Sequence, residues 1–103
     1  MDEVRTKEIT YGRKIVFDNG DRYRTTHLEY AKTIEVAAGA DIDKVSLRLE
    51  EEVDAYLAAK AVESRFGVNY GKDATTVRKI EAYEREVNSF LKSINLGHCK
   101  VEL

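Results

Sequence analysis

The sequence contains no proline and one cysteine, Cys99, among its 103 residues. The absence of proline leaves no sign of a rigid proline-rich linker or ligand. A single cysteine excludes both a disulfide within the chain and a cluster of thiolate metal ligands. No apolar run approaches the roughly 18 residues that a membrane-spanning helix needs. These absences are typical of a reducing compartment, and we expect a cytoplasmic protein with no membrane partner.

Motifs for catalysis and for cofactor binding are also missing. No glycine-rich phosphate loop occurs, and the two histidines, His27 and His98, form no metal-binding pair. His98 and Cys99 are neighbours in sequence, so their side chains would point apart in a strand. We therefore expect no enzymatic activity, no catalytic residue, no metal and no cofactor. A site assembled across an oligomer interface is the one enzymatic alternative that stays open.

The composition that is present favours one small folded domain over residues 1–103. Hydrophobic residues make up 43% and charged residues 35%, with a formal net charge of −2. This balance provides no overall basic field of the kind that many nucleic-acid-binding proteins carry. A domain of this size buries a small share of its surface, so we expect a homodimer or a higher homo-oligomer.

The first third of the chain predicts an antiparallel β-hairpin over residues 4–37, with strands at 4–17 and 22–37. Apolar side chains alternate from Ile9 onward, and Asn19-Gly20 is a strong hairpin turn signal. If these two residues form the whole loop, Tyr11 lies opposite Leu28. The apolar side chains of both strands then share one face.

The rest of the chain predicts two amphipathic helices, at 42–66 and 76–95. Apolar residues recur at three- and four-residue steps in both segments. Asp41 is a good N-cap for the first helix and Gly67 a good C-cap, while Asn95 and Gly97 end the second. The predicted fold is α+β, with the helices as an antiparallel pair on one face of the hairpin and with a possible short C-terminal strand.

Basic and aromatic residues gather near the predicted turn. Guanidinium groups bind phosphate with two donors, and aromatic rings stack on bases. The cluster therefore predicts a site for a phosphate-rich ligand, either nucleic acid or a signalling nucleotide. A solubilising hairpin is the alternative, because basic residues also protect sheet edges from aggregation. The residues concerned are Arg13, Lys14, Phe17, Arg22, Tyr23 and Arg24.

An acidic run in the first helix offers a second candidate surface. Glu50, Glu51 and Asp54 belong to this run, which can imitate nucleic acid toward a basic protein. The ordinary interpretation of such a run is a solvated helix face. Tyr70, in the segment between the helices, is a candidate contact for the same protein partner.

The segment Ile9-Thr10-Tyr11-Gly12-Arg13-Lys14-Ile15 resembles the first strand of small bacteriophage and mobile-element accessory proteins. This resemblance covers residues 4–64 at most, and the chain departs from the pattern in its turn and its long second strand. It implies a protein acting inside a host cell, as a binder of nucleotide signals or nucleic acid, or as an inhibitor of a host defence protein. It transfers no functional residue to this chain.

Overall fold

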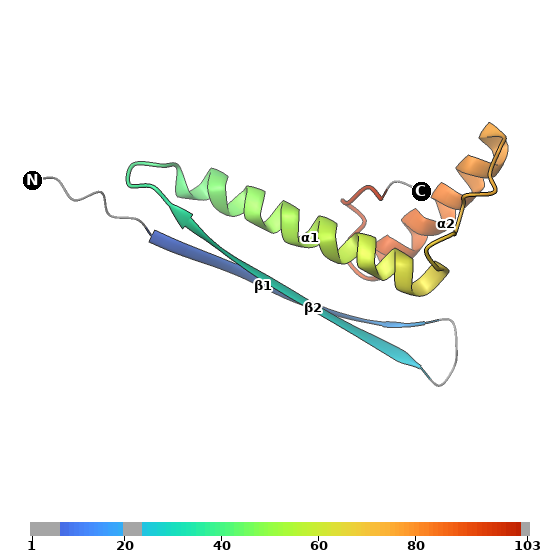
Figure 1. Ribbon diagram of the computed structural model, residues 1–103, viewed down its shortest axis with the longest axis horizontal. Coiled ribbons are helices and arrows are strands. Elements are labelled where there is room, and N and C mark those ends of the chain that lie inside the picture. The colour runs from blue at the N-terminus through green and yellow to red at the C-terminus, as the bar shows by residue number, and fades with distance from the viewer. Residues whose placement is uncertain (1–6, 20–23, 102–103) are drawn as a thin grey trace, which may run out of the picture.

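The computed structural model describes residues 7–19 and 24–101. Figure 1 shows a long two-stranded antiparallel hairpin with a helix lying along it and a second helix near one end. This arrangement confirms the predicted α+β fold. The elements are β1 (Lys7–Asp18), β2 (Thr25–Val36), α1 (Ile42–Phe66) and α2 (Val77–Ser93).

The helix ends follow the capping residues that the sequence predicts. The Asp41 carboxylate accepts hydrogen bonds from the backbone N–H groups of Asp43 and Lys44, at 3.1 and 3.3 Å. Gly67 ends α1 with a φ of 94°, and its N–H donates to the Glu63 carbonyl oxygen at 2.9 Å. The predicted bounds of α1 are therefore confirmed, because local backbone chemistry alone determines both ends.

The predicted register of the hairpin is wrong. Tyr11 lies opposite Lys32, and Leu28 lies opposite Ile15. The strands are joined by a longer connection than two residues, since the Asn19 N–H donates to the Arg24 carbonyl oxygen at 3.2 Å. The turn chemistry proposed for Asn19-Gly20 falls partly outside the described residues. The partner of Tyr11 is Lys32 and not Leu28, so the observed register differs from the predicted one by an even number of residues. The apolar side chains of both strands therefore share one face, as predicted.

Cross-strand pairing explains why this register is preferred. Three of its pairs join matched side chains, and such pairs each stabilise an antiparallel sheet by roughly 0.2–1 kcal/mol, which offsets the like-charge pair of Glu8 and Glu35. The predicted register would have put a tyrosine opposite Ile9 and a glutamate opposite Thr10. In the structure the two threonine hydroxyls of one pair are hydrogen-bonded at 2.7 Å. The pairs are Ile9 with Ile34, Thr10 with Thr33, and Lys14 with Glu29.

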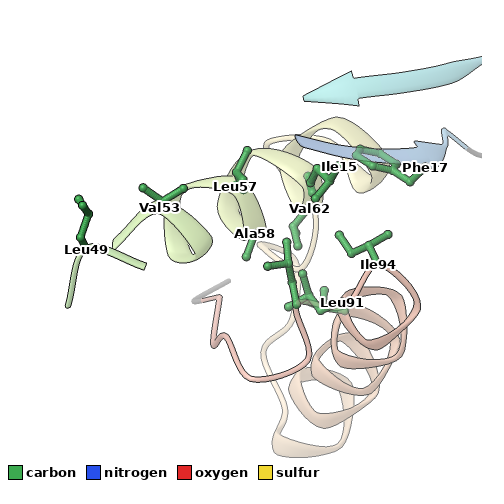
Figure 2. Close-up of a cluster of buried hydrophobic side chains, with 12 residues drawn as sticks. Ile15, Phe17, Leu49, Val53, Leu57, Ala58, Val62, Leu91 and Ile94 are labelled. Carbon is green, nitrogen blue, oxygen red and sulfur yellow. The ribbon is translucent and has the colours of Figure 1, made fainter. Parts of the chain in front are cut away.

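One apolar core joins the inner face of the hairpin to both helices. Leu49, Val53 and Leu57 of α1 face the hairpin and are fully buried (Figure 2). Ile15 and Phe17 meet them from β1, near the C-terminal half of α1. Small side chains on the other flank of that half allow a second layer to pack closely. That layer consists of Leu91, Ile94 and Leu96 from the end of α2 and the residues after it.

Both helices lie on the same side of the hairpin, but α2 reaches it only with its C-terminal end (Figure 1). Val87 and Leu91 are the buried residues of α2. Asn95 follows with a φ of 61°, which ends the helix near the predicted position. The C-terminal segment up to Val101 forms turns and no strand within the described residues.

The molecule is elongated for its length. Its principal extents are 61, 34 and 19 Å, and its radius of gyration is 17.6 Å. A compact domain of this length would have a radius of about 13 Å. The hairpin is covered on one face only, so much of its backbone and side-chain surface stays exposed.

Candidate functional site

Two members of the predicted phosphate-binding cluster are engaged within the fold. The Arg13 guanidinium lies 3.2 Å from the Asp54 carboxylate and donates a hydrogen bond to the Asn95 carbonyl oxygen at 3.0 Å. Phe17 is only 6% exposed, and its ring meets Phe90 edge-on with centroids 5.2 Å apart. Neither side chain is placed to receive a ligand at the turn, because both lie on the face that α1 and α2 cover.

The remaining members of that cluster are exposed or lie outside the described residues. Lys14 is exposed on the outer face of the hairpin, opposite Glu29. Arg24 is exposed just before β2 begins. Arg22 and Tyr23 lie outside the described residues. The six residues therefore do not form a single site in the described structure, and Lys14 and Arg24 are those that solvent reaches.

Asp54 does not lie on the solvated acidic face where the sequence placed it. It is 6% exposed and makes polar contacts with three side chains. The Tyr11 hydroxyl donates to it at 3.2 Å, His98 Nε2 lies 3.0 Å from its other oxygen, and Arg13 forms the ion pair. One carboxylate thus connects β1, α1 and the C-terminal segment, which makes Asp54 a structural residue rather than a partner contact.

The spacing of α1 contains the signal that could have placed Asp54 correctly. Asp54 follows the buried Val53 and precedes Ala58 by four residues, and residues four apart share a helix face. Glu50 and Glu51 belong to the same acidic run but are exposed. The burial of Asp54 is not apparent from the sequence because the three other carboxylates of the run face solvent.

The polar cluster around Asp54 includes the only thiol. Burial, and then the negative charge of Asp54, raise the pKa of Cys99. Burial, the charge of Asp54 and the hydrogen bond to it also raise the pKa of Tyr11. His98 pairs with Asp54 and makes no hydrogen bond to Cys99 in the described structure. Without a base at the sulfur, the thiol stays protonated at neutral pH and is a poor nucleophile.

Tyr70 packs the segment that connects the two helices against both of them. Its ring stacks on Phe66 with centroids 4.5 Å apart and meets Tyr83 edge-on at 4.7 Å. Its hydroxyl donates to the Glu86 carboxylate, and the Tyr83 hydroxyl donates to Asp73 at 2.7 Å. Burial and the bond to Glu86 raise the pKa of Tyr70. Most of this side chain is therefore engaged within the fold, and only part of it could contact a partner.

The N-terminal half of α1 has a bare outer surface. The side chain of Leu47 is 56% exposed. Its neighbours three or four residues away on the helix surface are Asp43, Glu50 and Glu51, which are acidic, and Lys44. We call Leu47, Asp43, Glu50 and Glu51 the Leu47 patch. The end of α2 and the C-terminal segment pack against the other half of α1, which leaves this patch in solvent (Figure 1).

The residues that the structure describes provide no group of three or more histidine, cysteine or carboxylate side chains placed to hold a metal ion. None of the described helices is both long enough and apolar enough to span a bilayer.

Comparisons with protein-family models, with curated proteins and with solved structures find no match to this chain. The resemblance to bacteriophage accessory proteins therefore stays a prediction. Any functional conclusion must come from the surfaces of the chain itself.

Proposed function

We propose that this chain is a non-enzymatic protein-binding module that docks a basic protein partner on the Leu47 patch. The observation that carries this proposal is a large apolar side chain that is exposed on a helix and has three carboxylates and one lysine as its neighbours. Protein interfaces have the same anatomy, with an apolar centre inside a polar rim. Leucine can act as the anchor that fills a pocket on the partner, while the charged rim directs the approach.

The charges of α1 are divided between the fold and the solvent. Asp54 is held by Arg13, and Glu52 is held by Lys32 at 2.6 Å. Glu50 and Glu51 form no ion pair within the described residues. The carboxylates on the Leu47 side are thus available to a partner, and those on the hairpin side are not.

The chemistry of the rim favours a partner whose own ligand is nucleic acid. Carboxylates spaced along a helix can occupy the positive surface that such a protein offers to phosphates. The resemblance to phage accessory proteins adds a setting, in which the partner would be a host defence protein. On this proposal the chain inhibits its partner by occupying that surface.

A crosslinking experiment tests the proposal. A photoreactive amino acid is placed at position 47, and the captured protein is identified after illumination in a host lysate. The matched control places the same group at position 63, because Glu63 is exposed on the same helix but pairs with Lys60 away from the patch. Adducts specific to position 47 are expected, and equal adducts from both positions would contradict the proposal.

Affinity for the captured protein then measures the contribution of each part of the patch. Leu47→Ala should weaken binding about tenfold or more, as truncating a central apolar anchor does. Glu50→Gln with Glu51→Gln should reduce the association rate and its dependence on salt. Glu63→Gln should change neither quantity.

A phosphate-rich ligand on the hairpin is a second candidate, favoured by the exposure of Lys14 and Arg24. These residues lie toward the turn end of the hairpin, away from the Leu47 patch. The test titrates single-stranded DNA, duplex DNA and a cyclic dinucleotide into the chain at low salt. Binding that Lys14→Ala with Arg24→Ala abolishes would support this candidate, and no binding at low salt would end it.

A further inference from the structure

We infer that two copies of this chain associate through the outer edge of β2, which joins their hairpins into one four-stranded antiparallel sheet. This inference concerns a surface separate from the Leu47 patch and does not depend on the proposed function. Leu47 and Glu52 are five residues apart, so they point about 140° apart around α1. Glu52 lies on the side of α1 that faces Lys32 of β2.

The edge of β2 has the features of a strand that pairs. It runs for 12 residues without proline and has a strand partner on one side only, within the described residues. Long regular edges expose a row of unpaired backbone groups, and monomeric proteins interrupt them with proline, bulges or free lysines. The lysine in the middle of β2, Lys32, is held by Glu52. The edge is therefore not protected in the usual ways.

The two edges of the hairpin differ in what lies beside them. On the β1 side, Phe90 contacts Phe17 and the Asn95 carbonyl oxygen accepts from Arg13. On the β2 side, the described side-chain contacts come from α1 alone, as Glu52 to Lys32 and Tyr56 to Tyr30. A second hairpin can approach β2 without displacing α2 or the C-terminal segment.

One register makes β2 complementary to itself. A two-fold axis perpendicular to the sheet at Ala31 keeps both α1 helices on the same face. On that inner face, Leu28 then lies opposite Ile34 of the second copy, and Tyr30 lies opposite its Lys32. The first pair is apolar, and the second places a cation beside an aromatic ring.

The outer face agrees with the same register. His27 lies opposite Glu35 of the second copy, and Glu29 lies opposite Thr33, so no like charges meet. Moving the axis one residue toward the C-terminus, to Lys32, would put Lys32 opposite itself and Glu29 opposite Glu35. Moving it one residue the other way, to Tyr30, would put Leu28 opposite the charged Lys32. Of these three registers, the one centred on Ala31 is free of such a conflict.

Association would also cover aromatic surface that one copy leaves open. The Tyr56 ring stacks on Tyr30 with centroids 4.2 Å apart, yet Tyr56 remains 46% exposed. In the paired sheet the two α1 helices lie side by side over the centre, and this flank of α1 faces its copy. An isolated two-stranded sheet is marginal, whereas four strands with a covered face form a stable unit.

Disulfide crosslinking tests both the edge and the register. Ala31→Cys in a Cys99→Ser background places the two new thiols opposite each other, within the distance that a disulfide needs. Thr33→Cys in the same background is the matched control, because in this register position 33 faces position 29. We expect a disulfide-linked dimer from the first variant, formed roughly tenfold faster than from the second, since only facing positions meet the geometric limits.

Charge variants test the same contact by sedimentation and native mass spectrometry. His27→Glu should raise the dimer dissociation constant by roughly 2- to 30-fold, because two like-charge pairs appear per dimer, and adding Glu35→Lys should restore it. Val16→Glu is the control, since Val16 is exposed opposite His27 but belongs to β1. A monomer at all concentrations would overturn the inference. Crosslinking of Thr33→Cys in preference to Ala31→Cys, or a dimer indifferent to His27→Glu, would overturn it as well.

Discussion

The Tyr11 hydroxyl donates a hydrogen bond to Asp54 across 3.2 Å, although 43 residues separate them in the chain. Asp54 also holds Arg13 and His98, so the middle of α1 is tied at once to β1 and to the C-terminal segment. The molecule is elongated, and a buried carboxylate with three polar partners specifies how its elements fit together. The cluster is built for structure rather than for chemistry.

Replacing Asp54 by alanine should therefore be costly. The change leaves Arg13 and Tyr11 without their acceptor inside the fold, and we expect a loss of about 2–3 kcal/mol in the free energy of unfolding. Urea denaturation followed by circular dichroism measures it. Glu51→Ala, an exposed change three residues earlier on the same helix, should stay within about 0.5 kcal/mol. Equal stabilities for the two variants would show that the cluster contributes nothing.

Two leucines of α1 should separate stability from binding. Leu57 is 1% exposed and packs against the hairpin, so Leu57→Ala should cost about 2–5 kcal/mol. Leu47→Ala removes a side chain that solvent already reaches and should change stability by no more than about 0.5 kcal/mol. Thermal or urea unfolding of both variants checks the contrast. A large loss for Leu47→Ala would mean that Leu47 packs within the protein or its dimer and is not free for a partner.

Local chemistry accounts for what could be predicted from the sequence. Asp41 and Gly67 set the ends of α1 because a cap acts on its own neighbouring backbone groups. The alternation of apolar residues likewise assigned each strand face correctly. The predicted register was wrong because it relied on a short-range turn signal, whereas the sum of many cross-strand pairs determines the observed register. Ile15 pairing with Leu28 could not be read from either strand alone.

The candidate site was less predictable than the fold because its partners are distant in sequence. The sequence predicts Arg13 and Phe17 as ligand-binding residues near the turn, but α1 and the end of α2 cover the side of β1 on which both lie. Asp54 looked like one more acid in an exposed run. Only the three-dimensional arrangement identifies Arg13 and His98 as the residues that justify its burial.

The Cys99 thiol should react slowly with an alkylating reagent. Burial and the charge of Asp54 raise its pKa, so less thiolate is present at neutral pH than in the unfolded chain. We expect alkylation by iodoacetamide to be at least several-fold slower in the native protein than in urea, measured by mass spectrometry. Asp54→Asn should speed the reaction of the folded protein, because it removes the negative charge but keeps the shape. A native rate equal to the rate in urea would mean that the C-terminal segment does not hold Cys99 as described.

Alkaline pH should destabilise the protein through three hydrogen-bonded tyrosines, Tyr11, Tyr70 and Tyr83. The pKa of Tyr70 is raised by burial and by its bond to Glu86, and the pKa values of Tyr11 and Tyr83 are raised as well. A raised pKa means that the folded state keeps the phenolic proton after the unfolded chain has begun to lose it, near the ordinary value of 10.0. The stability due to these groups is therefore complete below pH 10.0 and falls as the pH rises above it. Urea denaturation at a series of pH values measures the fall, which should be shallower for Tyr70→Phe because that variant has no phenol to ionise at this position. An equal dependence of the free energy of unfolding on pH in both proteins would show that Tyr70 does not contribute to the alkaline loss of stability.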